Sequence, residues 1–261
     1  MTKPEEIFGK LHLIIMALRK GCPWDKKQTP ATFKSYLIEE AYELLEAIDK
    51  GMPVSIKEEL GDMFFQVLFL ARLYEEKGDF SLSEVLEAIC TKMVHRHPHV
   101  FGDETVSSEQ DQRQKWNQLK TQEKEEITNL ADLLANVPKN LPGLRRAQRV
   151  SERAANNGFE WQNIQGALKK LDEEVDEIKM AVKSGEKTDI SEEIGDALFV
   201  LVNIGRLTQL NAEESLHKAT DKFIRRFSCL EENAKQLHLT IADLSYQQLL
   251  DMWDKAKRVT R

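Results

Sequence analysis

The sequence predicts an all-α protein built from two tandem copies of one helical module. Long stretches carry apolar residues at the 3.6-residue spacing of a helix, and runs of alternating β-branched residues are missing. An ordered set of motifs also occurs twice along the chain. We expect helices between the glycine- and proline-rich interruptions, which fall at 21–30, 51–53, 97–102, 138–142, 156–158 and 183–188.

The first expected helix covers 1–20. Its apolar residues at 11–18 follow Glu5 and Glu6, and no small-residue cleavage site comes after them. We therefore expect an amphipathic helix and not a signal peptide. No apolar stretch approaches the roughly 20 residues that cross a bilayer, so we expect no membrane span.

The repeat is clearest in two acidic motifs. Residues 58–62, EELGD, return as 192–196, EEIGD, and residues 39–43, EEAYE, match 173–177, EEVDE, both at an offset of 134. Such ordered matches indicate a duplication with altered loop lengths. The helical pattern breaks around 129–141, so we expect modules at 1–130 and 140–261, joined by a linker at 131–139.

Each copy carries four acidic residues on two expected helices. Residues three apart share a helix face, and the short loops at 51–53 and 184–185 would make each helix pair antiparallel. The four carboxylates of a copy would then converge: Glu40, Glu43, Glu59 and Asp62 in the first, and Glu174, Glu177, Glu193 and Asp196 in the second.

Clustered carboxylates raise one another's pKa unless a cation compensates them. All-oxygen ligands favour Mg²⁺, with Mn²⁺ as a substitute, over zinc. The alternative is that these acids form only a solvated helix face, which the presence of two spaced copies argues against.

The acidic motifs are followed by apolar runs at 63–71 and 197–204. Both are apolar nearly all round a helix, and such helices must be buried on every side. A module of this size has few helices for the purpose, so we expect each run to pack on another module or on a second chain.

Basic and aromatic residues also recur at i, i+4 spacing, which places each pair on one helix face. The pairs are Lys92 with Arg96, Lys222 with Arg226, Trp116 with Lys120, and Trp253 with Lys257. The Lys–Arg pairs suit phosphate binding, with surface ion pairing as the alternative. The tryptophans would stack on a base or anchor a C-terminal helix to the core.

Further along, Trp24 and Trp161 correspond at an offset of 137, and we expect both to line a groove. His95, His97 and His99 alternate around a proline; without cysteine or acid at zinc-like spacing, a loop or helix-end role is the better interpretation.

The net charge of -7 argues against stable nucleic-acid binding. Three cysteines without CxxC spacing predict reduced thiols and a cytoplasmic protein.

Taken together, these motifs resemble the MazG family, the tandem-domain branch of the all-α nucleoside triphosphate pyrophosphohydrolases. The resemblance rests on GCPWD at 21–25, the acidic pairs, HPHVF at 97–101, residues 141–142 with 146–148, and GFEW at 158–161. It implies helical bundles completed by dimerisation. It also implies Mg²⁺-dependent hydrolysis of ribo- and deoxynucleoside triphosphates to monophosphate and pyrophosphate, as nucleotide-pool house-cleaning.

The resemblance also implies roles for residues. The eight acids named above would be metal ligands, and the substrate contacts would be Lys170, Lys222, Arg226, Trp253 and Lys257, with Lys92, Arg96, Trp116 and Lys120 in the first copy. Glu173 and Glu192, each adjacent to a ligand, are candidate general bases. Neither copy has lost an acid; we favour the second as catalytic because the His-Pro-His loop does not interrupt its basic set.

Several alternatives stay open at this point. The acids could hold a metal structurally in a non-catalytic nucleotide sensor or a helical partner-binding protein, or the scaffold could serve a dUTP-selective enzyme. The apolar runs could pair within one chain as a pseudo-dimer. The short linker and the resemblance favour a homodimer instead.

Overall fold

The computed structural model describes residues 3–108, 111–112, 115–116, 119 and 129–260. Within these ranges the regular structure is helical and no strand occurs, as the sequence predicts. The chain divides into two compact units, Met1–Glu123 and Lys124–Arg261. None of the described helices combines the length and apolarity that a membrane crossing requires.

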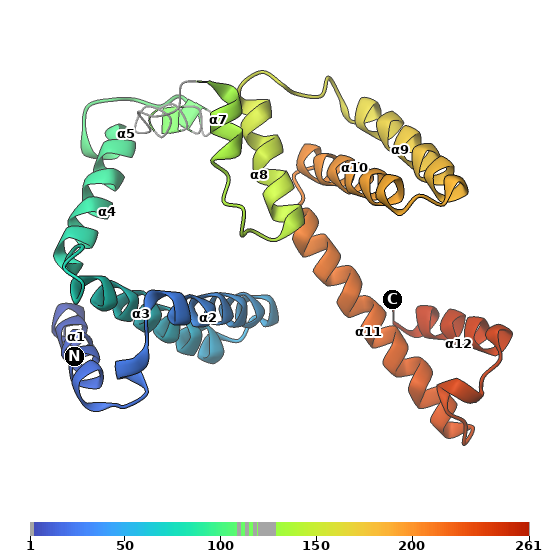
Figure 1. Cartoon of the computed structure of the whole chain (residues 1–261), viewed down its shortest axis with the longest axis horizontal. Helices are drawn as coiled ribbons and strands as arrows, with labels where there is room; N and C mark the ends of the chain where they lie inside the picture. The colour runs from blue at the N-terminus through green and yellow to red at the C-terminus, as the bar shows by residue number, and fades with distance from the viewer. Residues whose placement is uncertain (1–2, 109–110, 113–114, 117–118, 120–128, 261) are drawn as a thin grey trace. The chain divides into compact units, whose positions relative to one another are not determined.

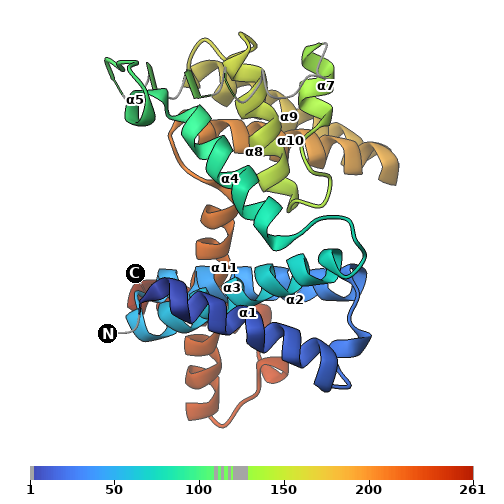
Figure 2. The same cartoon turned by 90° about the vertical axis from the view of Figure 1, so that its left-hand side faces the viewer.

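The first unit is organised around one helical hairpin. Its elements are α1 (Pro4–Gly21), a 3-10 helix (Asp25–Lys27), α2 (Pro30–Lys50), α3 (Pro53–Glu75), α4 (Leu82–Arg96) and α5 (Pro98–Phe101). Helices α2 and α3 run antiparallel along their length, and α1 lies against this hairpin (Figures 1 and 2).

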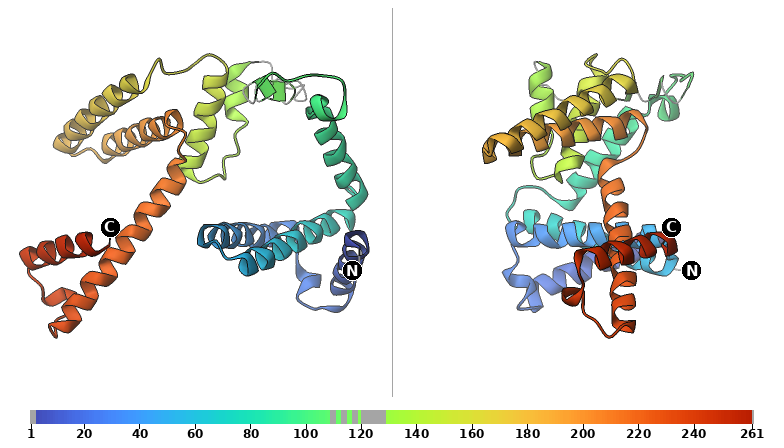
Figure 3. Two further views of the ribbon diagram at one scale, coloured as in Figure 1. Left: turned by 180° about the vertical axis from the view of Figure 1, so that it is seen from behind. Right: turned by 90° about the vertical axis from the view of Figure 1, so that its right-hand side faces the viewer.

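The second unit repeats the hairpin and adds a C-terminal arm. Its elements are α7 (Leu130–Ala135), α8 (Gly143–Asn156), α9 (Ile164–Ser184), α10 (Lys187–Leu207), α11 (Ala212–Gln236), a 3-10 helix (Ile241–Asp243) and α12 (Tyr246–Val259). Helix α8 packs on α10, and the α11–α12 hairpin leads away from the α9–α10 hairpin (Figure 3).

Local sequence explains where the two central hairpins begin and turn. The side chains of Thr29 and Asn163 accept hydrogen bonds from backbone N–H groups at the N-termini of α2 and α9. Gly51 and Gly185 end these helices with φ of +63° and +79°, a left-handed conformation that glycine adopts without the Cβ penalty. The chain therefore reverses at the two loops that the sequence marks.

The two units differ in how they fill their cores. In the first, Ile15 from α1 packs with Phe33, Leu68, Phe69 and Leu73 from the hairpin. In the second, Leu230, Ala234, Leu244 and Met252 hold α12 on α11.

The apolar runs are not buried on every side within the single chain. In α3, the side chains of Phe64 and Val67 are 54% and 49% exposed, and in α10 Leu201 is 46% exposed. Each central hairpin thus keeps an apolar face that its own unit leaves uncovered.

The segment 131–139, which the sequence suggested as a linker, belongs to the second compact unit. It contains most of α7, which packs on α8. Arg153 donates a hydrogen bond of 2.5 Å to the carbonyl oxygen of Leu133, and Val137 is only 2% exposed. The contacts of α7 with α8 and the hydrogen bond from Arg153 therefore join this segment to the module that follows it.

Candidate active site

Three carboxylates of the second module meet between α9 and α10. Glu174 and Glu177 lie one turn apart on α9, and Glu193 lies on the antiparallel α10. One carboxylate oxygen from each lies within 4.8 Å of the others. This spacing suits three ligands of one cation, because oxygen atoms that bind a common Mg²⁺ each lie about 2.0–2.1 Å from it.

The first module repeats the arrangement. Glu40 and Glu43 on α2 and Glu59 on α3 also offer oxygens within 4.8 Å of one another. Gln66 donates a hydrogen bond of 3.0 Å from its Nε2 to Glu40 Oε1. One oxygen of the half-buried Glu40 therefore already has a neutral partner.

The fourth acid of each copy, Asp62 or Asp196, is exposed and lies outside the three-oxygen group. It still acts electrostatically. Partial burial, followed by the charges of neighbouring acids that include this aspartate, raises the pKa of Glu59 in the first module and of Glu193 in the second. Both clusters therefore hold negative charge that lacks full compensation.

Glu174 is the most buried member of either cluster. Its side chain is 4% exposed, and its Oε2 has no hydrogen-bond partner among the described residues. Lys170, one turn earlier on α9, brings its Nζ to 2.9 Å from Glu174 Oε1, and to 3.8 Å from Glu177. Burying a carboxylate with one free oxygen is unfavourable unless a further cation or donor reaches it.

The lysine distinguishes the two copies. At the 134-residue offset of the repeat, Tyr36 stands in the first module where Lys170 stands in the second, and Gln66 corresponds to Val200. In the first cluster an amide group donates to a carboxylate, whereas in the second an ammonium group does so.

The candidate bases lie at the edge of the second cluster. Glu173 and Glu192 are both exposed, and Glu173 pairs with Lys170 at 3.7 Å. The charge of Glu192 contributes to raising the pKa of Glu193. A general base must lie within hydrogen-bond reach of the water that it deprotonates, and the assignment of either residue as the base stays a prediction.

The basic and aromatic residues of the second module lie along the α11–α12 hairpin. Trp253 packs on Phe223 with ring centroids 5.1 Å apart and borders the core of this hairpin. Arg226 donates to the hydroxyl of Thr260, and Lys257 pairs with Asp254 at 2.5 Å, while Lys222 is exposed. Trp253 thus anchors the C-terminal helix, and the hairpin diverges from α9 and α10 (Figure 3).

The corresponding residues of the first module are partly described. Lys92 is exposed on α4, and the guanidinium of Arg96 lies over the ring of Trp116, 5.3 Å from its centroid. Lys120 falls outside the described residues.

The histidines take the helix-end role that the sequence favours. His97 ends α4 and begins α5, and its Nδ1 lies 2.7 Å from the carbonyl oxygen of Met93. Among the described residues, neither group with metal-binding spacing contains a histidine.

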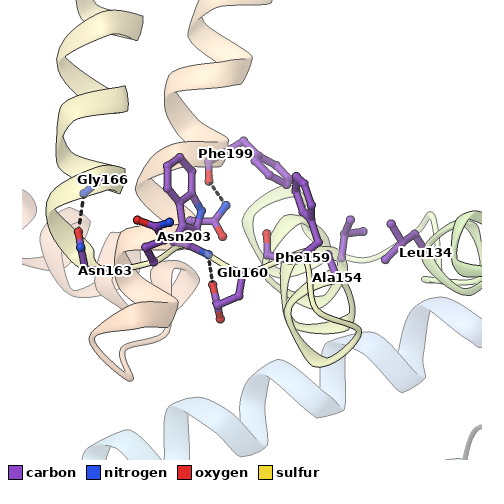
Figure 4. A pocket seen from close by; sticks show the side chains of 12 residues that line it. Leu134, Ala154, Phe159, Glu160, Asn163, Gly166, Phe199 and Asn203 are labelled. Carbon is purple, nitrogen blue, oxygen red and sulfur yellow. Dashed lines mark hydrogen bonds between the residues drawn. The ribbon is translucent and has the colours of Figure 1, made fainter.

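The second module also contains a cavity, in addition to its acidic cluster. It measures about 570 Å³ and lies between α8, the α8–α9 loop, α9 and α10, with Ser151, Phe159, Trp161, Gly166, Phe199 and Asn203 in its lining. Figure 4 shows Asn203 and Phe199 between the turn at Asn163 and Gly166 and the side chain of Phe159. Trp161 thus lines a pocket as expected. Trp24, its counterpart in the first module, packs edge-on against Tyr36, with ring centroids 5.6 Å apart.

Known protein families match the chain in two separate segments, one in each copy of the repeat. Residues 28–101 and 162–228 each match the family model described as the MazG nucleotide pyrophosphohydrolase domain. These segments contain all eight acids of the two clusters.

Relatives match across nearly the whole chain. It is 39% identical over 253 residues to the nucleoside triphosphate pyrophosphohydrolase/pyrophosphatase MazG of Thermotoga maritima, covering 96% of each chain. It is 36% identical over 254 residues to the nucleoside triphosphate pyrophosphohydrolase of Escherichia coli, covering 95% of this chain and 96% of that one. It is 42% identical over 257 residues to the uncharacterized protein YabN of Bacillus subtilis, covering 97% of this chain and 52% of YabN. With two domain matches that span more than half of its residues, the chain belongs to the MazG nucleotide pyrophosphohydrolase family.

Proposed function

We propose that this protein hydrolyses nucleoside triphosphates, both ribo and deoxy, to monophosphate and pyrophosphate, with Mg²⁺ held by the carboxylates of the second module. One observation carries the proposal: Glu174 is buried with Oε2 unpartnered among the described residues, inside a group of three carboxylates. The names of the Thermotoga maritima and Escherichia coli relatives support the reaction type.

The residues present fit a hard divalent cation. Glu174, Glu177 and Glu193 offer only oxygen donors, and Asp196 lies one turn from Glu193 on the same helix. These four would hold Mg²⁺, or Mn²⁺ in its place. When bound, the ion supplies neutralisation of phosphate charge and a bound water of lowered pKa.

The chain's own groups would position substrate and move the proton. The oxygen of the attacking water bonds to the α-phosphorus, and Glu173 or Glu192 accepts a proton from that water. The bond between the α-phosphorus and the bridging oxygen breaks, and that oxygen leaves with pyrophosphate. Lys170 contacts Glu174 through a flexible side chain that is 39% exposed, and it can turn from the carboxylate to a phosphate oxygen.

Three observations favour the second module over the first. Glu174 is buried and its Oε2 lacks a partner among the described residues, whereas Glu40 is only half-buried and its Oε1 accepts a hydrogen bond from Gln66. The second module also has a lysine at the cluster and an open cavity on the same hairpin. We therefore place turnover in the second module, with a house-cleaning role in the nucleotide pool.

We further propose a homodimer whose groove includes the dimer interface. The exposed apolar faces of α3 and α10 would be covered by a second chain, since large exposed apolar patches mark association sites. The α11–α12 hairpin diverges from the α9–α10 hairpin (Figure 3). A second chain would therefore bring its own Lys222 and Arg226 to the acidic cluster of the first, where they would bind phosphate.

One observation favours a second candidate, a non-catalytic nucleotide sensor. Lys170 lies within 4.0 Å of three carboxylates and so compensates part of their charge without a metal. In a sensor, nucleotide would displace this lysine and no bond would be cleaved.

The test is pyrophosphate release from the purified full chain, with Mg²⁺ and a panel of all common ribo- and deoxynucleoside triphosphates. We expect release by the wild type and a loss of at least about 100-fold in Glu177→Gln, because the metal supplies several kcal/mol to the transition state. A dUTP-selective enzyme would show release from dUTP alone.

Two matched variants complete the test. Asp176→Asn changes a carboxylate on the outer face of α9 that pairs with Lys179 and should leave release unchanged. Glu43→Gln makes the corresponding change in the first cluster. If it abolishes release while Glu177→Gln does not, turnover belongs to the first module; if the wild type binds nucleotide but releases no pyrophosphate, the sensor is correct.

A further inference from the structure

Helix α8 carries three arginines on one side, Arg146, Arg149 and Arg153, which we call the arginine face. Their spacings of three and four residues place the side chains within an arc of about 60° around the helix axis. The whole chain has a net charge of -7, so this face departs from the overall charge of the protein. A cluster of basic side chains creates a local positive potential, which attracts anions.

The arginine face lies on the side of α8 that is opposite to its buried residues. Gln148, Ser151 and Ala154 are the buried residues of this helix, and Ser151 and Ala154 line the cavity. Because each residue advances about 100° around the axis, Ser151 lies about 160° from both Arg149 and Arg153. The arginine face is therefore separate from the cavity.

Arg153 is a half-buried cation without an acidic partner. Its Nη1 donates a hydrogen bond of 2.5 Å to the carbonyl oxygen of Leu133 in α7. In the described part of the chain, no carboxylate forms an ion pair with its guanidinium. Burial, followed by the positive charge of Arg149, lowers the pKa of Arg153 from its ordinary value. A neutral carbonyl oxygen leaves this charge uncompensated.

Arg19 in the first module shows the compensated arrangement. Arg19 and Arg153 both stand in the last turn of the helix that precedes a central hairpin. Arg19 also donates to a backbone carbonyl oxygen, that of Gln28 at 3.4 Å, but its Nη2 pairs with a carboxylate oxygen of Glu76 at 2.6 Å. The first module thus supplies an acid from its own hairpin, whereas Arg153 receives none from the described residues of the second.

One acid lies beside the arginine face. Glu152 pairs with Arg149 through one carboxylate oxygen at 2.7 Å and accepts a hydrogen bond of 3.0 Å from Gln148 through the other. Arg146 is exposed and has no ion-pair partner among the residues that the structure describes. Three arginines and one glutamate leave two positive charges on this face. An anion would compensate them.

The geometry of the face suits a ligand with several linked phosphate groups. A guanidinium is a planar fork that can donate two parallel hydrogen bonds to the oxygens of one phosphate. At 1.5 Å per residue, Arg149 and Arg153 are about 6 Å apart along the axis, and Arg146 and Arg153 about 10 Å. A single small anion cannot contact all three guanidinium groups at this spacing. A chain of phosphates can follow the row and carries the multiple charge that it requires.

We propose that the arginine face of α8 is a second anion site, which binds the polyphosphate group of a small effector molecule outside the two carboxylate clusters. Arg149 and Arg153 bind neighbouring phosphates, and Arg146 extends the row toward the N-terminus of α8. The site is independent of the proposed reaction, because it contains none of the residues to which that reaction is assigned.

Isothermal titration calorimetry of the full chain with inorganic tripolyphosphate, in the presence of chelator, tests this site. Without divalent cations the carboxylate clusters repel anions and do not contribute. The wild type should bind one tripolyphosphate per chain, and Arg149→Gln/Arg153→Gln should weaken binding by about tenfold or more, because charge-assisted hydrogen bonds are lost. Arg258→Gln, which removes an exposed arginine of α12, should leave binding unchanged. No binding by the wild type, or unchanged binding by the folded double variant, would overturn the proposal.

Arg149→Gln alone keeps the test decisive if the double variant does not fold. The side chain of Arg149 is 48% exposed, so its loss should leave the melting temperature nearly unchanged while tripolyphosphate binds more weakly. Unchanged affinity in this variant would overturn the site.

Two further ligands separate the possible sources of the anion. Citrate that binds as tightly as tripolyphosphate would reveal a general attraction for anions and overturn the assignment to phosphate groups. A single-stranded oligonucleotide that binds more tightly than tripolyphosphate would overturn the assignment to a small molecule. We expect both to bind more weakly, and tripolyphosphate to lose affinity as the salt concentration rises.

Discussion

The lysine inside the second cluster gives a sharp test of the site's electrostatics. Lys170→Met removes the charge but keeps a long side chain with good helix propensity. Glu174 would then be a buried carboxylate without its partner at 2.9 Å. We expect the metal-free protein to lose stability for this reason.

The magnitude follows from burial. Removing one partner of a fully buried ion pair costs about 3–5 kcal/mol. Lys170 is 39% exposed and Glu174 is 4% exposed, so water screens one side of the pair. A smaller loss is therefore expected, roughly 3–6 °C in the melting temperature of a unit of this size.

The assay is thermal unfolding in chelator and in excess Mg²⁺, with Lys179→Met as the matched control. Lys179 lies on the same helix and pairs with Asp176 at 2.7 Å, and both side chains are more than 60% exposed. Its loss should change stability by about 0.5 kcal/mol or less. Mg²⁺ should stabilise Lys170→Met more than the wild type, because the lysine no longer compensates the negative charge that attracts the cation. Equal melting of the two variants in chelator would refute this reasoning.

Three further outcomes are expected. The double variant Glu193→Ala/Asp196→Ala should abolish turnover. It should stay folded by circular dichroism, because fewer carboxylates repel one another. Full activity of this variant, with the first cluster also disabled, would contradict the carboxylate mechanism. Light scattering at micromolar concentration should give twice 30.1 kDa, and an active species of 30.1 kDa would favour the intramolecular pseudo-dimer. The hydrogen bonds from Arg206 lower the pKa of Glu160 from its ordinary value near 4.5. The pair therefore stabilises the folded protein above about pH 4.5, and this stabilisation is lost as the pH falls through the lower pKa that Glu160 has in the folded state. In urea unfolding, Arg206→Met should therefore reduce the loss of stability between about pH 5 and pH 3, and an unchanged acid limb would contradict this.

The central hairpins could be predicted because their signals are local. The 134-residue repeat, the helical periodicity and the glycines at 51 and 185 together specify two antiparallel helix pairs. Spacing of three residues then puts Glu174 and Glu177 on one face. The convergence of these acids with Glu193 could therefore be predicted from the sequence of the hairpin alone.

The remaining features depend on long-range packing. The sequence left both base stacking and core anchoring open for Trp253, and only the structure reveals its contact with Phe223 of α11. The cavity depends on which side chains fill a buried space, which periodicity does not reveal. The sequence does contain one indication of the cavity: Asn203 stands at the repeat offset from Phe69. A buried amide in place of a buried phenyl ring indicates that the two modules pack this position differently.

The identity of the phosphorus products tests the central claim most directly. Phosphorus NMR of a nucleoside triphosphate incubated with the wild type and Mg²⁺ should show monophosphate and pyrophosphate appearing together, and Glu174→Gln should show neither. Diphosphate and orthophosphate from the wild type, or unchanged pyrophosphate formation by Glu174→Gln, would contradict hydrolysis between the α- and β-phosphates at the second cluster.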